Sequence, residues 1–239
     1  MLTSANIVPF DFNKVLAGAA EFPGVKIERE EFLQNNFSSR FDSEMVTQIV
    51  QTSPIRAGVN ESVLHEIARE CIDYEQMKVS ALSFATGCGG LVGIPADLAQ
   101  YLAHVLRISQ KLAYIYGYPE IFSIEGSMDE KTQKIILLFI GVMYGVSGAN
   151  KVIAEISKLL GDKVGKDILR AALTKTAWYP LLQQVCKQVG IKVTKDALSK
   201  TTTKVFPVIG GVVSAGISYH GFGKGAKRLH KTLRENPVR

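Results

Sequence analysis

The sequence predicts an all-α fold, a single compact bundle of glycine-rich, closely packed helices with an irregular N-terminal segment. Three observations carry this prediction. Apolar residues recur at spacings of three and four from Asn60 onward, which is the period of a buried helix face. No segment alternates cleanly between apolar and polar residues, and no Asn-Gly or Asp-Gly turn separates apolar runs. Three long segments without a charged residue carry small residues four positions apart, a spacing that lets a second helix backbone approach closely.

Residues 1–58 form the irregular segment, because Pro9, Pro23 and Pro54 interrupt any long helix there. Only short helices are expected, such as Ser43–Gln51. We therefore treat residues 1–58 as an extension that packs on a helical domain formed by residues 59–239.

The helical domain begins at Asn60, whose side chain is well suited to an N-cap. The residues that follow place an apolar stripe on one face of a helix. Its members are Val63, Leu64, Ile67, Cys71, Tyr74 and Met77.

The three uncharged segments are Val79–Ala96, Ile135–Asn150 and Val205–Gly223. A membrane-spanning helix needs roughly 20 apolar residues, and these segments are at or below that length and contain Pro95 or Pro207 or several glycines. The pattern favours a packed helical core over shallow or conditional insertion into a membrane, and helical periodicity alone leaves both open.

A new helix is expected to start beside Gly93 and Pro95, with proline near the first helical position and Asp97 in the first turn. One face of this helix is apolar, and the other carries a polar stripe. This stripe can line a pocket for an anionic headgroup or a reacting water; the alternative is a buried ladder of ion pairs that fixes the register of the helix. Its members are Asp97, Tyr101, His104, Arg107 or Ile108, and Lys111.

Charge is divided unevenly along the chain, whose net charge is +6. Residues 1–134 carry a net charge of −6 and residues 135–239 a net charge of +12. The basic half ends in a cationic tail, which suits an anionic surface such as lipid, or one half of the chain docking on the other; an ordinary solvated surface is the alternative. The candidate membrane contacts are Lys224, Lys227, Arg228, Lys231 and Arg234.

Two stretches of the sequence resemble a known family. They are ATGCGGLVGIPADLAQYLAHVLRISQKLAYIYGYPE (residues 85–120) and TKVFPVIGGVVSAGISYHGFGKGAKRLHKTLRE (residues 203–235). Both are similar to the EcsC family of bacterial proteins, over about residues 60–235. The resemblance implies a hydrophobic helical cytoplasmic module, named after an operon shared with an ABC transporter, and some members are labelled hydrolase or protease. Tyr219-His220 departs from the small or polar residues expected there.

Motifs of catalysis are incomplete. His65-Glu66-Ile67-Ala68-Arg69 has arginine where the zinc motif HExxH needs its second histidine. The segment at 145–149 is one residue from the nucleophile elbow GxSxG, but it reads as continuous helix instead of a strand-to-helix turn. Asp97 and His104 remain the candidate catalytic residues.

Motifs for cofactors, metals and nucleic acid are also missing. The glycines at 221–225 lack the strands and acidic residue of a dinucleotide site, and no P-loop is present. Cys71, Cys88 and Cys186 are too widely spaced for a zinc site and indicate buried thiols in a reducing compartment. No helix-turn-helix or RNA-binding signature accompanies the basic half. We expect no metal and no cofactor.

The function expected from the sequence is therefore a non-catalytic helical module that associates with anionic membrane lipid or a membrane protein. A hydrolase of lipid or peptide that uses the Asp97/His104 stripe is the alternative. The first residues, MLTSANIVPFDFNK, lack the features of a secretory signal, so we expect a cytoplasmic protein, peripheral on the inner face of the membrane. Trp178-Tyr179-Pro180 is compatible with an interfacial anchor or with a core tryptophan.

Overall fold

The computed structural model describes residues 12–88, 94–122, 130–161 and 207–239, and over these ranges it consists of helices without strands. The predicted all-α class is confirmed. The helices are α1 (Phe12–Ala20), α2 (Arg29–Phe37), α3 (Ser43–Gln51), α4 (Glu61–Cys88), α5 (Ile94–Ile115), α6 (Glu130–Met143), α7 (Ala149–Gly161) and α10 (Pro207–Glu235).

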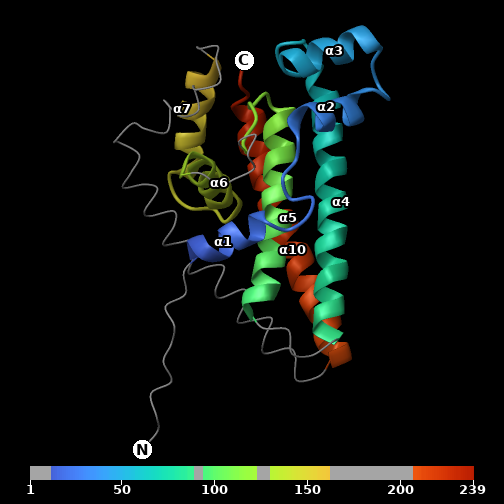
Figure 1. Ribbon diagram of the computed structural model, residues 1–239, viewed down its shortest axis with the longest axis vertical. Helices are drawn as coiled ribbons and strands as arrows, with labels where there is room; N and C mark the ends of the chain where they lie inside the picture. Colours follow the sequence, from blue (N-terminus) through green and yellow to red (C-terminus); the bar gives the residue numbers. More distant parts are fainter. Residues whose placement is uncertain (1–11, 89–93, 123–129, 162–206) are drawn as a thin grey trace, which may run out of the picture.

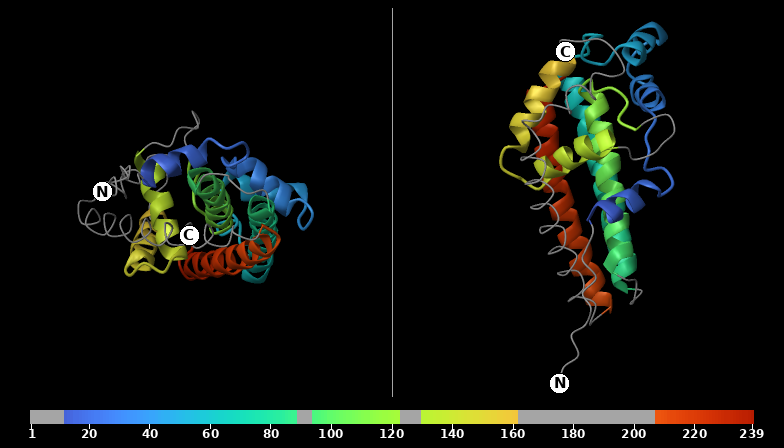
Figure 2. Two further views of the ribbon diagram at one scale, coloured as in Figure 1. Left: turned by 90° about the horizontal axis from the view of Figure 1, so that it is seen from below. Right: turned by 60° about the vertical axis from the view of Figure 1, so that its left-hand side comes forward.

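Three long helices, α4, α5 and α10, lie side by side and form the body of the molecule (Figure 1). Helix α4 runs antiparallel to both α5 and α10, and its contact with α10 is the most extensive between any two of these helices. Helix α6 packs against α10 and α5, α7 continues from it, and α1 crosses α5 (Figure 2). Helices α2 and α3 pack on each other beside the start of α4.

Three buried tyrosines, spaced two positions apart, lie at the end of α5 and just after it. Tyr114, Tyr116 and Tyr118 are among the largest fully buried side chains. The hydroxyl groups of Tyr118 and Ser157 of α7 lie 2.7 Å apart, and the hydroxyl of Tyr114 donates a hydrogen bond of 2.6 Å to Glu120. The end of α5 is thereby joined to α7 and to the chain that follows it.

The described part of the N-terminal segment is held against α5 by polar side chains. Gln110 of α5 accepts a hydrogen bond from the Ile27 amide at 3.0 Å and donates one to the Val25 carbonyl at 2.8 Å. Arg29 donates to the carbonyl groups of Val50, Thr52 and Tyr118. These bonds tie the three short helices α1–α3 to the long helices.

The expected helix Ser43–Gln51 is confirmed as α3, and its N-cap is Asp42, whose side chain accepts a hydrogen bond from the Met45 amide at 2.8 Å. The expected start near Pro95 is also confirmed, because α5 begins at Ile94. Gly93 lies outside the described residues. The uncharged segment Val79–Ala96 therefore contributes to two helices, α4 and α5.

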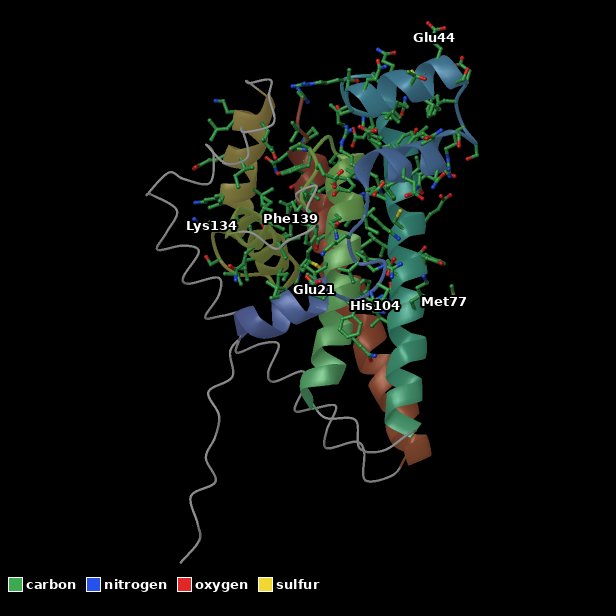
Figure 3. All side chains as sticks on the ribbon, viewed as in Figure 1. Glu21, Glu44, Met77, His104, Lys134 and Phe139 are labelled. Carbon is green, nitrogen blue, oxygen red and sulfur yellow. The ribbon has the colours of Figure 1, made fainter. Side chains whose placement is uncertain are left out.

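Two expectations about helices were wrong. The apolar stripe of α4 does not end in Tyr74 and Met77, which are 49% and 60% exposed. Met77 lies on the outer side of α4 (Figure 3), and the buried side of the helix continues instead through Glu75 and Val79. Residues 135–150 are not one helix, because α6 ends at Met143 and the left-handed Gly145 and Gly148 form a turn before α7.

Among the described residues, no helix is both long enough and apolar enough to span a bilayer.

Candidate functional site

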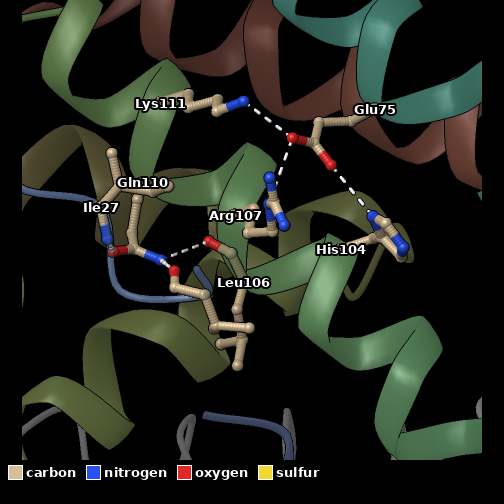
Figure 4. Close-up of polar contacts among 8 residues, drawn as sticks. Ile27, Glu75, His104, Leu106, Arg107, Gln110 and Lys111 are labelled. Carbon is tan, nitrogen blue, oxygen red and sulfur yellow. Dashed lines mark hydrogen bonds and ion pairs between the residues drawn. The ribbon is translucent and has the colours of Figure 1, made fainter. Parts of the chain in front are cut away.

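A buried carboxylate stands at the centre of the polar residues between α4 and α5 (Figure 4). Glu75 of α4 is fully buried. Its Oε1 lies 2.7 Å from Lys111 Nζ and 3.3 Å from Arg107 Nε, and its Oε2 lies 3.0 Å from His104 Nδ1. All three basic side chains come from α5, where spacings of three and four residues place them on one face.

The structure thus brings together three members of the predicted polar stripe and separates a fourth from them. Tyr101 points elsewhere: its hydroxyl accepts a hydrogen bond of 3.2 Å from Tyr144, and its ring meets Phe222 of α10 edge to face. Ile108 is fully buried in the apolar core, so Arg107 and not Ile108 belongs to the stripe. The side chain of Asp97 lies outside the part of the chain that the structure describes.

Electrostatics keep the Glu75 carboxylate ionised. Burial alone raises the pKa of this carboxyl group, but the hydrogen bond from His104 and the charges of Lys111 and Arg107 outweigh burial and hold the pKa at about 2. The Glu75 carboxylate therefore faces an ammonium group, a guanidinium group and an imidazole. Among the residues that the structure describes, Arg107 Nε has no hydrogen-bond partner, because its approach to Glu75 is an ion pair without hydrogen-bond geometry.

Sequence reasoning missed Glu75 and expected the acid of an ion-pair ladder to be Asp97. One signal was available, since Glu75 follows Cys71 by one turn on the face of α4 that also buries Leu64. An acid on an otherwise apolar face needs a cationic partner, because an unpaired buried charge is very costly. The helix that supplies the partner could not be identified from α4 alone.

Two chemical roles fit this arrangement. In the first role, His104 is a general base, and the Glu75 carboxylate orients its ring by accepting a hydrogen bond from Nδ1. In the second role, the cluster is structural: Lys111 and Arg107 neutralise the charge of Glu75 and hold α5 against α4. The structural role accounts for all three contacts of Glu75, whereas catalysis would use only the contact with His104.

A second candidate site lies on the exposed side of α10, and we call it the α10 basic face. At about 3.6 residues per turn its members occupy an arc of roughly 120°. All five predicted membrane-contact residues belong to it and are exposed: Lys224, Lys227, Arg228, Lys231 and Arg234.

Three members of the α10 basic face contact neighbouring groups. Arg228 donates a hydrogen bond of 3.3 Å to the Met143 carbonyl at the end of α6. Arg234 lies 3.5 Å from Glu61 of α4, and Lys231 lies 3.8 Å from Glu235 on the same helix. These exposed ion pairs are weak, so they leave most of the positive charge available to a partner.

Neither motif-like segment has the structure that its motif requires. Ser147 lies in a turn between two helices, without the strand that a nucleophile elbow requires. Gly223 and Gly225 are interior to α10 and pack against Gln76 and Met143, so they are not a dinucleotide turn.

Thiols and imidazoles of the described residues do not assemble a metal centre. No group of three histidine, cysteine, aspartate or glutamate side chains among them could hold an ion. Cys71 is a buried free thiol whose pKa burial raises to about 11. The Cys88 side chain, Cys186 and Trp178-Tyr179-Pro180 lie outside what the structure describes.

In a comparison with known proteins, no family model, no curated protein and no solved structure matches the chain.

Proposed function

We propose that this protein is a non-catalytic helical module, similar to the EcsC family, that associates with an anionic membrane surface presented by lipid or by a membrane protein. The α10 basic face is the observation that carries the proposal. Five cationic side chains share one exposed side of a single helix, and Glu235 is the only acidic residue between Lys224 and Arg234 or next to them on α10.

The position of the α10 basic face supports a peripheral mode of binding. The opposite side of α10 is buried, with Phe222, Leu229 and Leu233 in the core, so the helix is fixed with its charges outward. Each cation near an anionic membrane contributes about 1 kcal/mol, and several of them on one rigid helix act together. In this proposal the protein works at the inner face of the membrane.

Flotation with vesicles of phosphatidylglycerol and phosphatidylcholine tests the proposal. Replacing Lys224, Lys227, Arg228, Lys231 and Arg234 with glutamine should abolish flotation with anionic vesicles, since about 1 kcal/mol is lost per charge. Added salt should weaken binding of the unaltered protein, because it screens exposed charges. Equal binding to neutral vesicles would contradict the proposal.

A matched pair of variants separates position from net charge. Lys224→Gln/Lys227→Gln and Lys151→Gln/Lys158→Gln each remove two exposed lysines, the first pair from α10 and the second from α7. We expect the α10 pair to lower partitioning roughly tenfold after screening is allowed for, and the α7 pair to change it much less. Equal losses would mean that net charge, and not the α10 basic face, drives binding.

A hydrolase of lipid or peptide is the second candidate, and the hydrogen bond between His104 and Glu75 is the observation that favours it. In this candidate, His104 is the general base, and Asp97 of the same helix is the second candidate catalytic residue. His104→Ala should then lower turnover of a fluorogenic lipid ester or peptide by about 10²-fold or more. The α10 variants are the control, because they leave this cluster intact. Turnover that is unchanged by His104→Ala would exclude the stripe as a catalytic site.

A further inference from the structure

The seam between α4 and α5 carries more positive charge than its acidic partner neutralises. We call three basic side chains there the seam cations: Lys78 of α4, and Arg107 and Lys111 of α5. Among the described residues, Glu75 is the only acid in contact with any of the three. At pH 7 each seam cation has a formal charge of +1 and Glu75 has a formal charge of −1, so the seam keeps a formal net charge of +2.

The guanidinium group of Arg107 has donors that the described part of the fold does not satisfy. A guanidinium carries five N–H donors in a planar fork. Arg107 Nε lies 3.3 Å from Glu75 Oε1 without hydrogen-bond geometry, and Glu75 instead accepts its hydrogen bonds from Lys111 and His104. The Arg107 side chain is 20% exposed, so a ligand can reach it from solvent. An anion with several oxygens would satisfy this fork.

Lys78 extends the seam cations to the surface of α4. Its Nζ lies 4.2 Å from the centroid of the exposed Tyr74 ring, and Lys111 Nζ lies 5.5 Å from the same centroid. Glu70, one helical turn before Tyr74, is already paired with Arg40 at 2.6 Å. Two ammonium groups beside one ring repel each other, and an anion bound next to them would offset that repulsion.

We propose that the seam cations bind the dianion of a phosphate monoester, supplied either by a lipid headgroup or by a free phosphate compound. Arginine binds two phosphate oxygens at once, and lysine adds a point charge. A phosphate monoester has about two negative charges at neutral pH, which match the formal charge of the seam, whereas a diester has one. The inference goes beyond the proposed function and does not depend on it, because that function uses the α10 basic face.

Isothermal titration calorimetry with glycerol 3-phosphate tests for a free ligand. The full chain is titrated at about pH 8, where the monoester is a dianion. We expect saturable binding that Lys78→Gln and Arg107→Gln each weaken roughly tenfold, the effect of one lost charged hydrogen bond. Dimethyl phosphate is the matched control ligand, because it is a diester with one negative charge, and it should bind roughly tenfold more weakly.

Flotation tests for a lipid source of the same chemistry. Vesicles of phosphatidylcholine with phosphatidic acid present a monoester headgroup, and vesicles with phosphatidylglycerol present a diester at the same surface charge. We expect a preference for phosphatidic acid that Lys78→Gln and Arg107→Gln both lose. Lys224→Gln/Lys227→Gln is the control, since it should weaken binding to both kinds of vesicle and leave the preference intact.

The outcomes of the two experiments decide the inference. Binding of glycerol 3-phosphate supports a free ligand, and a preference for phosphatidic acid supports a lipid. Absence of both overturns the inference, as does equal binding of dimethyl phosphate without that preference, or any signal that a folded Lys78→Gln variant leaves unchanged. Circular dichroism checks folding, and Lys78→Gln suffices to decide because Lys78 has no ion pair among the described residues. Failure of the proposed function is distinguishable, since it concerns binding to phosphatidylglycerol and the α10 variants.

Discussion

At the scale of single residues, Glu75 decides how α4 and α5 fit together. It is a fully buried acid that faces Lys111, Arg107 and His104, and each of these side chains is itself largely buried. Such a cluster stabilises a fold less than its number of contacts implies, because four groups lose water. We expect its main effect to be on specificity, since a different register of α5 against α4 would leave the charges unpaired.

Removing the charge of Glu75 should therefore be costly. Glu75→Gln keeps the size of the side chain but leaves Arg107 and Lys111 without a counter-charge, and we expect a loss of about 3 kcal/mol in the free energy of unfolding, measured with urea. Glu70→Gln is the matched control, because its exposed ion pair with Arg40 is worth about 1 kcal/mol at most. Equal losses in the two variants would show that the cluster is not a lock.

His230 makes the stability of the fold sensitive to acid. Burial, followed by the charges of His65, Arg234 and Arg69, lowers the pKa of His230 from 6.5 to about 4. The folded state thus favours the neutral ring. The contribution of His230 to the free energy of unfolding is therefore complete above about pH 6.5, and it is lost as the pH falls from there toward about 4.

Thermal or urea unfolding at a series of pH values measures this contribution. We expect the unaltered protein to lose about 3 kcal/mol at most across this range. His230→Gln should lack this part of the loss and keep the part below about pH 4.5, where protonation of Glu75 begins to cost stability. An identical pH profile for both proteins would contradict the assignment to His230.

At the scale of elements, the ends of helices are fixed by glycines in particular conformations. Gly117 follows the end of α5 with a φ of +90°, and the Val238 amide bonds to the carbonyl of the preceding Tyr116 at 3.0 Å. A Cβ atom on Gly117 would lie 2.6 Å from the Val238 carbonyl oxygen. The close approach of the chain after α10 therefore depends on this glycine.

Gly117→Ala should cost about 2–4 kcal/mol, because the left-handed backbone disfavours a side chain and the Val238 carbonyl blocks it. Gly58→Ala is the control, since Gly58 has a φ of +76° but open space around the added atom. It should cost only the conformational part, about 1–2 kcal/mol. If denaturation gave the same loss in the free energy of unfolding for both variants, the contact with Val238 would contribute nothing to the cost at Gly117.

The long helices could be predicted from the sequence, whereas the turn between α6 and α7 could not. Periodic apolar residues and Pro95 identify α5 and its start, because a helix buries one face along its whole length. Residues 135–150 read as one helix because glycine is compatible with a helix interior. In the structure Gly145 has a left-handed backbone, and Arg228 of α10 lies beside it and donates a hydrogen bond to the end of α6. Contacts of this kind, made by a distant helix, cannot be read from residues 135–150 alone.

The same limit applies to the sites. Spacing within α5 placed His104, Arg107 and Lys111 on one face, but spacing contains no information about which helix lies opposite. Glu75 and the contact between His65 and His230 arise only when α4 meets α5 and α10. Such partners must come from the tertiary structure.

At the scale of the whole molecule, the Gln110 side chain is one of the groups that join the N-terminal segment to the long helices. Gln110→Ala would leave the Ile27 amide and the Val25 carbonyl without their partners, and we expect a loss of about 2 kcal/mol or more. Hydrogen exchange of the amides at 16–27 should accelerate more than that of α4. Gln34→Ala, which alters an exposed glutamine of α2, should leave exchange unchanged; acceleration by both variants would assign the effect to α2 and not to the docking.

The buried tyrosines at the end of α5 give the fold an optical signature in alkali. Burial raises the pKa of Tyr114, Tyr116 and Tyr118 above the ordinary value near 10, whereas a hydrogen bond and the charge of Lys78 lower the pKa of the exposed Tyr74. Phenolate absorbance should therefore appear in two stages, first from exposed rings and later from buried ones. Because the buried rings ionise far more easily once exposed, stability falls as the pH rises past about 10, and the second stage should coincide with loss of helical circular dichroism.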